Sequence, residues 1–106
     1  MTRQPFTITF AKEAKAHFRA IERKYHALIR ATIEEQLQFE PDRETRNRKR
    51  LEPPAPFEAG WEIRCGPDNR FRVLYDIDLE NREVEILAIG IKVRNHLFVG
   101  GEEVDP

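Results

Sequence analysis

In the N-terminal part of the chain, the spacing of the apolar residues changes from every second position to every third or fourth position. Residues Phe6–Phe10 alternate apolar and polar side chains, which predicts a strand with one buried face. Between Phe10 and Tyr25, apolar side chains recur every three or four residues without proline or glycine, as in an amphipathic helix. A second helical stretch runs from about His26 to Phe39, and Pro41 ends it. Because no strong breaker separates the two stretches, one bent helix is the alternative to the helical hairpin that we expect.

The second half of the chain has the period of strands. The runs Trp61–Cys65, Phe71–Ile77 and Val84–Ile89 each alternate between two sets of side chains. Turn-forming residues at Gly66–Asn69 and Leu79–Asn81 separate these runs. Three such runs joined by short turns predict a three-stranded antiparallel meander, which a short basic C-terminal segment follows.

Residues 41–60 connect the two halves and carry four of the seven prolines. They also contain a basic run, Arg43–Arg50, with five cations against one anion. We expect a long surface connection without regular structure, of the kind that is usually functional or disordered. The predicted fold class is therefore α+β, with a single domain over residues 1–106. We expect the two helices to cover one face of the sheet and to leave the other face basic and open.

The composition limits the class of protein. At 106 residues the chain is long enough for one domain, and its 40% of apolar residues are too many for a disordered chain. The single cysteine, Cys65, excludes an internal disulfide and a cysteine-based zinc site. The longest apolar stretch, Ile86–Ile91, is too short to cross a membrane, and the N-terminus lacks the apolar core of a signal peptide. We expect a cytoplasmic protein with no membrane partner.

Cations are concentrated locally, although the net charge is only −1. Strand alternation places Glu62, Arg64 and Arg72 together on the face that the helices leave bare. The cations expected near this face are Lys49, Arg50, Arg64, Arg72, Lys92 and Arg94. Guanidinium groups on rigid strands suit phosphate oxygens and can stabilise the added charge of a phosphorane-like state in RNA cleavage. The alternative is a solvated face on which Arg64 and Arg72 pair with Glu62, Asp76 or Asp78.

Two side chains near this cluster are candidates for proton transfer. Glu52 follows the basic run and can accept a proton from a ribose 2′-hydroxyl, the alternative being an exposed loop carboxylate. His96 lies in the basic C-terminal segment and is a candidate general acid or base. We expect His17 near the apolar stripe of the first helix, His26 at the helix junction and Cys65 in the core. The chain has no serine, no phosphate-binding glycine loop and no paired-histidine helix, so we expect no metal and no cofactor.

The order of these elements and three stretches of sequence resemble the RelE/ParE toxin family of bacterial type II toxin–antitoxin systems. The stretches are Trp61–Cys65, Arg70–Ile77 and Ile86–Phe98. In this family the strand pair reads roughly W-x-[LI]-R…[YF]-R-[VL]-x-[YF], and the last strand ends in a glycine that a basic segment follows. The likeness covers nearly the whole chain and implies a RelE-like fold.

The resemblance implies a toxin that a cognate antitoxin holds inactive. In RelE-like members the free toxin enters the ribosomal decoding site and cuts messenger RNA by attack of the ribose 2′-hydroxyl, without a metal. By position, Arg72 and Arg64 match basic residues of the strand pair, and Lys92 matches the basic residue after the last strand's glycine. These three would stabilise the phosphate. Phe98 falls where the nuclease members often have a tyrosine that stacks on the substrate base.

The remaining roles under this hypothesis concern protons and the RNA backbone. His96 or Glu52 would transfer protons, and the RNA backbone would be bound by Lys49, Arg50 and Arg94. Glu62 and Phe98 stand where the best-known nucleases of the family have a lysine and a tyrosine.

Those two departures keep two other hypotheses open. One is a ParE-like toxin that inhibits DNA gyrase through a protein contact and needs no catalytic residues. The other is an antitoxin-bound corepressor with no enzymatic activity. In every version the partners include the antitoxin, lying across the helices or the basic face, and operator DNA is reached only through it.

Overall fold

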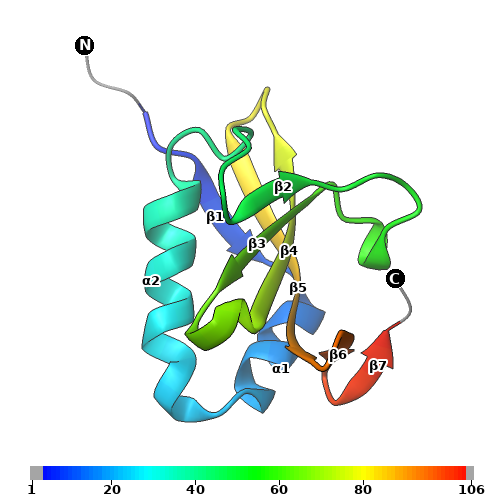
Figure 1. The fold of residues 1–106 in the computed structure, drawn as a ribbon. Coiled ribbons are helices and arrows are strands. Elements are labelled where there is room, and N and C mark those ends of the chain that lie inside the picture. The colour runs from blue at the N-terminus through cyan, green and yellow to red at the C-terminus, as the bar shows by residue number, and fades with distance from the viewer. Residues whose placement is uncertain (1–3, 105–106) are drawn as a thin grey trace.

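The computed structural model describes residues 4–104, which form two α-helices and seven strands (Figure 1). The elements in chain order are β1 (Thr7–Phe10), α1 (Lys12–Ala20), α2 (His26–Leu37), β2 (Arg48–Arg50), β3 (Trp61–Cys65), β4 (Phe71–Asp78), β5 (Glu83–Val93), β6 (His96–Val99) and β7 (Glu102–Val104). Three short 3₁₀ turns also occur, at Arg23–Tyr25, Pro56–Glu58 and Pro67–Asn69. The predicted α+β class is confirmed.

One sheet contains all seven strands, in the order β2-β3-β4-β5-β6-β7, with β1 beside β5. The predicted antiparallel meander is confirmed as β3, β4 and β5. The long strand β5 has two different neighbours along its outer edge. Its first half pairs in parallel with β1, up to Phe10 opposite Ile86, and its second half pairs with β6 from Gly90 onward. The sheet is therefore mixed, and β5 runs through its centre.

The predicted helical hairpin is confirmed, but the break comes earlier than the expected junction at Tyr25 and His26. The backbone is already extended at Ile21, and a 3₁₀ turn precedes α2, which begins at His26. The His26 Nε2 atom lies 2.7 Å from the carbonyl oxygen of Ile21, a group that the end of α1 leaves without a helical partner. The helical period continues across this break, which is why the sequence alone did not locate it.

The main core lies between the helices and the sheet. The α2 residues Ile29, Ile33 and Leu37 are fully buried in it. The sheet residues expected on this face are there, namely Trp61, Ile63, Phe71, Val73 and Tyr75, and Cys65 joins them. Figure 1 shows α2 standing alongside the sheet.

The expectation that the opposite face is open is wrong. A second, smaller apolar cluster lies there, made of Ala59, Leu74, Ala88 and Val99 with Leu51, Leu87, Leu97 and Val104 packed against it. The residues come from the sheet, from the connection after β2 and from the β6–β7 hairpin. The segment expected to be a short basic tail therefore forms two strands and covers part of this face.

The expectation of an irregular basic connection is also wrong in part, because its end forms the edge strand β2. Alternation along this strand separates its three cations. Arg48 is buried, and its guanidinium donates to the carbonyl oxygens of Gln36 at 2.7 Å and Glu40 at 3.0 Å. Lys49 is exposed and lies opposite Glu62 in β3. A cation thus satisfies carbonyls at the C-terminal end of α2, where the helix dipole favours positive charge.

His17 fills a gap in the sheet. Between the last residue of β5 that pairs with β1 and the first that pairs with β6, the Ile89 amide donates to His17 Nδ1 at 3.4 Å. The His17 ring also meets the Phe57 ring edge-on at a centroid distance of 5.7 Å. The helix side of the molecule and the connection after β2 therefore touch through this gap.

This site predicts a pH-dependent stability. Burial lowers the pKa of the His17 imidazole below its ordinary value of 6.5, and the nearby Glu13 carboxylate opposes this shift. The folded state prefers the neutral His17 ring. The contribution of this ring to the free energy of unfolding is therefore complete above the pKa of histidine in the unfolded chain, and it is lost as the pH falls through the lower pKa of the folded state. We expect the free energy of unfolding to decrease from about pH 7 to about pH 5, and to decrease less in His17→Asn, which keeps an acceptor but does not titrate. Equilibrium denaturation at several pH values measures this, and equal slopes in both proteins would contradict it.

No helix within residues 4–104 is long and apolar enough to span a membrane.

Candidate functional site

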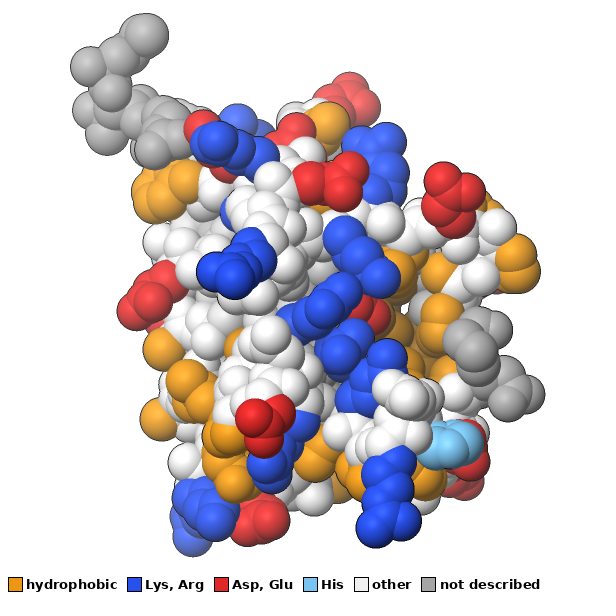
Figure 2. Space-filling model, viewed as in Figure 1, with side chains coloured by type: hydrophobic (Ala, Val, Ile, Leu, Met, Phe, Trp, Pro, Cys, Tyr) orange, Lys and Arg blue, Asp and Glu red, His pale blue; other side chains and the backbone are white. Residues whose placement is uncertain are grey.

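A groove of about 590 Å³ lies on the sheet face opposite the helices. The connection after β2 forms one wall and the β6–β7 hairpin forms another. The charged and imidazole side chains that line it are Lys49, Glu52, Glu62, Arg72, Lys92, His96 and Glu103. Its apolar lining includes Leu51, Leu97 and Val104. Figure 2 shows the hollow, with hydrophobic side chains inside it and a row of Lys and Arg side chains along one side.

The groove brings together five of the side chains that the sequence singled out for chemistry. They are Lys49 from β2, Glu52 from the following connection, Arg72 from β4, Lys92 from β5 and His96 from β6. Five separate segments contribute one residue each. Their catalytic and binding roles stay predictions; the structure places the five side chains around one groove.

The other four predicted residues lie outside the groove. Arg50 shares the helix-side face with Trp61, and its guanidinium carbon is 5.3 Å from that ring centroid. Arg94 stands with Asn95 in the turn between β5 and β6, where both residues have positive φ. Phe98 lines a separate hollow of about 330 Å³ on the helix side, so it does not reach Arg72. Phe98 pairs with Ile91, which packs against the main core, and not with Lys92, which lines the groove.

Arg64, the fourth of these residues, lies directly opposite Arg72 in the β3–β4 ladder, as alternation predicted. Glu62 lies between the two guanidinium groups. Its Oε1 atom is 3.3 Å from Arg72 Nη1 and 3.7 Å from Arg64 Nε. The Glu62 and Arg72 side chains are only 11% and 13% exposed, and Arg64 is 35% exposed. The pairing of both arginines with a carboxylate, which the sequence offered as the alternative to a phosphate site, is therefore present, and Glu62 is the partner.

The Arg72 guanidinium is held firmly by these contacts. Besides the bond to Glu62, its Nε donates to the carbonyl oxygen of Asn69 at 3.2 Å. A guanidinium carries five N–H donors, and these bonds use two of them. The other proposed partners are occupied elsewhere, since Asp76 accepts from the Gly60 amide and Asp78 accepts from Asn81. Arg72 is thus a fixed cation whose charge Glu62 partly compensates.

Glu103 is a groove residue that the sequence reasoning missed. Its Oε2 atom is 2.5 Å from Nδ1 of His96, which makes a carboxylate–imidazole pair at the groove. The adjacent glycines Gly100 and Gly101 both have positive φ and form the turn that folds β7 back on β6. These two glycines were the signal that could have predicted a hairpin and placed Glu103 beside His96.

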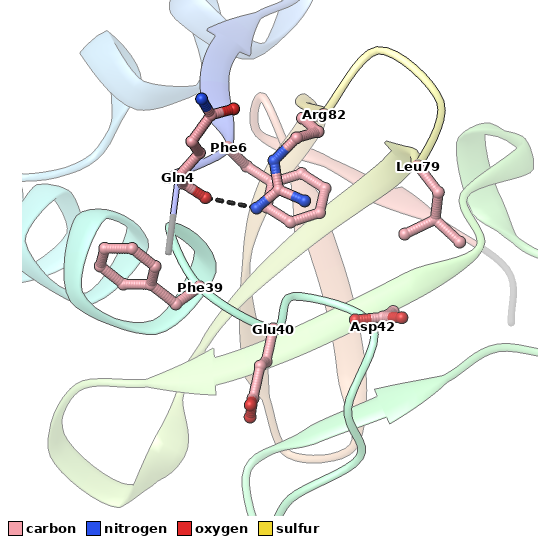
Figure 3. Close-up of a pocket in the computed structure, with 7 residues that line it drawn as sticks. All are labelled: Gln4, Phe6, Phe39, Glu40, Asp42, Leu79 and Arg82. Atoms are coloured by element: carbon pink, nitrogen blue, oxygen red, sulfur yellow. Dashed lines mark hydrogen bonds between the residues drawn. The ribbon is translucent and has the colours of Figure 1, made fainter. Parts of the chain in front are cut away.

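Another hollow, of about 440 Å³, lies where the N-terminal segment, the end of α2 and the β4–β5 turn meet (Figure 3). Its lining residues are Gln4, Phe6, Phe39, Glu40, Asp42, Leu79 and Arg82. The Arg82 guanidinium stacks on Phe6 at 4.5 Å from the ring centroid and donates to the Gln4 carbonyl. None of the residues predicted for chemistry lines this hollow. Within residues 4–104, no group of three or more His, Cys, Asp and Glu side chains is arranged to hold a metal ion.

Comparisons with known proteins agree with this architecture. A family model described as the ParE toxin of the type II toxin–antitoxin system parDE matches residues 6–95. The chain is similar to a structure of the toxin–antitoxin complex RelBE2 from Mycobacterium tuberculosis, with a TM-score of 0.68 and 24% identity over 86% of this chain and 95% of that one. It is also similar to the isolated RelE toxin of E. coli, with a TM-score of 0.61 and 17% identity over 84% of this chain and 86% of that one. No curated protein matches its sequence. The two structural matches support the fold alone.

Proposed function

This chain belongs to the ParE toxin family of type II toxin–antitoxin systems, and from that premise we propose that it is a toxin that cleaves messenger RNA on the ribosome. The observation that carries this proposal is the groove, which gathers Lys49, Arg72 and Lys92 with two proton-transfer candidates, Glu52 and His96. Cations and proton-transfer groups in one hollow are what cleavage of a phosphodiester requires.

In the proposed reaction the RNA strand lies in the groove with its scissile phosphate beside Arg72. The ribose 2′-oxygen attacks the neighbouring phosphorus and loses its proton to a groove base. A 2′,3′-cyclic phosphate forms, and the 5′-oxygen of the next nucleotide leaves with a proton from a groove acid. Arg72 and Lys92 stabilise the added negative charge of the intermediate state. His96 and Glu52 are the two candidates for the base that accepts the first proton and for the acid that donates the second.

A purified translation system tests this proposal. We expect the protein to cut ribosome-bound messenger RNA and to leave 2′,3′-cyclic phosphate ends, which primer extension and end-group analysis detect. Intact messenger at a toxin concentration equal to that of the ribosomes would contradict the proposal.

A second candidate function is inhibition of DNA gyrase through a protein contact, as in a ParE-like toxin. Two observations favour it: the matching family model is that of ParE, and Glu62 compensates the charge of Arg64 and Arg72. A supercoiling assay with purified gyrase separates the two candidates. Loss of supercoiling without messenger cleavage would support this second function, and full supercoiling at micromolar toxin would count against it.

We further propose a cognate antitoxin as the binding partner, through which operator DNA is reached. The similarity to the RelBE2 toxin–antitoxin complex of M. tuberculosis supports this. We expect the purified chain to form a stable complex with the product of the neighbouring gene. Titration calorimetry that detects no binding to that product would contradict the expectation.

A further inference from the structure

The β6–β7 hairpin holds a carboxylate against one particular nitrogen of an imidazole. Glu103 Oε2 is 2.5 Å from His96 Nδ1, and both side chains line the groove that also contains Arg72 and Lys92. The two side chains are 58% and 50% exposed, so solvent and a substrate can reach the pair. The proposed function gives His96 a proton-transfer role and says nothing about what orients its ring.

The pair comes from two strands whose register is set by the fold. Leu97 lies opposite Val104, and Phe98 lies opposite Glu103. The hairpin is anchored to the sheet because Val99 is buried and packs in the apolar cluster beneath the groove. The contact between Glu103 and His96 is therefore held by the paired strands of the folded domain.

The chemistry of this contact determines the proton on each ring nitrogen. A neutral imidazole has one N–H donor and one acceptor nitrogen, whereas a carboxylate can only accept. The hydrogen bond to Glu103 therefore requires Nδ1 to carry a proton, and in the neutral ring Nε2 is then the acceptor. A carboxylate at Nδ1 also stabilises the imidazolium that forms when Nε2 takes a proton.

We infer that Glu103 is a positioning residue for His96, which fixes the tautomer in which Nε2 exchanges protons with the RNA. This inference rests on the proposed cleavage function. In the reaction Nε2 takes the proton of the ribose 2′-hydroxyl, the oxygen–phosphorus bond forms, and the imidazolium keeps its Nδ1–H bond to Glu103. If the same ring then protonates the leaving 5′-oxygen, it returns to the neutral form and no net proton is gained.

Cleavage kinetics with the full chain test the inference. We expect Glu103→Gln to cleave ribosome-bound messenger RNA about tenfold or more slowly than wild type, because a neutral amide neither selects the tautomer nor stabilises the imidazolium. Glu103→Asp keeps the carboxylate and should recover part of the rate. Glu102→Gln, which removes the neighbouring carboxylate of β7, is the matched control and should cleave at the wild-type rate.

Two further measurements separate orientation from a structural effect. In a His96→Ala background, Glu103→Gln should cause no additional loss, because the residue that it positions is gone. Nitrogen-15 NMR of the imidazole should show Nδ1 protonated in the wild type, and Glu103→Ala should shift the neutral ring toward protonation at Nε2. Wild-type cleavage together with an unchanged rate in Glu103→Gln, or an Nε2-protonated ring in the wild type, would overturn the inference and leave the proposed function standing. A wild-type protein without any cleavage would instead end both.

Discussion

We expect Arg72→Ala to cut ribosome-bound messenger RNA about a hundredfold to a thousandfold more slowly than wild type. Arg72 is the arginine that lines the groove from the centre of the sheet, and its contacts with Glu62 and Asn69 hold it in one orientation. A preorganised cation stabilises the pentacoordinate phosphate without a reorganisation cost, so its removal slows the chemical step more than it weakens binding of the messenger. Single-turnover cleavage in a purified translation system measures both quantities.

Two further variants make this result interpretable. Removal of the Arg72 side chain leaves the nearly buried Glu62 without its closest cation, which can destabilise the fold. Arg72→Lys keeps a charge beside Glu62 but loses the bidentate guanidinium, so we expect a folded protein with an intermediate rate. Arg70→Ala is the matched control, because Arg70 lies just before β4 and does not line the groove. Wild-type rates in both Arg72 variants would rule out the proposed mechanism.

The largest expected effect on stability comes from Arg48→Ala. The Arg48 side chain lies in the interior, at 6% residue exposure, and donates to the carbonyl oxygens of Gln36, in the last turn of α2, and of Glu40, just after the helix. Alanine leaves these carbonyls without that donor and removes a cation from the negative end of the helix dipole. Because hydrogen bonds to charged groups contribute about 1.5–3 kcal/mol each, we expect the free energy of unfolding to fall by roughly 3 kcal/mol. That corresponds to a fall in Tm of more than about 10 °C for a domain of this size.

The neighbouring cations of β2 provide matched controls for this measurement. Lys49→Ala alters an exposed side chain on the groove face and should change the free energy of unfolding by less than about 0.5 kcal/mol. Arg50→Ala removes the contact with the Trp61 ring and should cost about 0.5–1 kcal/mol. Urea denaturation of the three variants gives the comparison. Equal stability of Arg48→Ala and Lys49→Ala would contradict the buried role of Arg48.

Tyr75 lies near Arg48 and shows how much of this region depends on contacts distant in the sequence. Its hydroxyl donates to the Pro41 carbonyl at 2.9 Å, inside the core. Burial raises the pKa of the Tyr75 hydroxyl well above its ordinary range, and the nearby Arg48 charge only partly opposes this. The tyrosine was expected on the helix-covered face from alternation alone, but its partner in the connection after α2 was not.

Local periodicity was sufficient for β1, for the presence of two helices and for the three strands of the meander, including the sidedness of β3 and β4. The two-residue period of β3 and β4 placed Arg64 and Arg72 together, and the structure has them in register. The same argument, applied to β2 as a strand, would have placed Arg48 and Arg50 on the helix-covered face and Lys49 on the opposite face. The run was too short, and too rich in charge, to show an apolar alternation, so Lys49 and Arg50 were assigned to one cluster although they lie on opposite faces of the strand.

The candidate site was predictable only in part. Lys92, His96 and Glu52 were selected by residue type, and folding brought them to the groove with Arg72. Phe98 was selected by family position, and the pairing of β6 with β5 turns it toward the helices. Glu103 was not selected, because Gly100 and Gly101 were not recognised as the turn that folds β7 back on β6.

The sequence by itself determined the helices, the meander and the face on which each central side chain lies, because a side chain's direction depends on the period of its own element. Beyond the meander, only the tertiary structure decided which segments became neighbours. The pairing of β2 with β3 buried Arg48 under the end of α2, and the fold-back of β6 and β7 completed the groove and set Glu103 against His96. The hydrophobic period of one segment does not reveal which other segment it will pair with. Strand pairing is fixed by the burial and hydrogen bonding of the whole sheet.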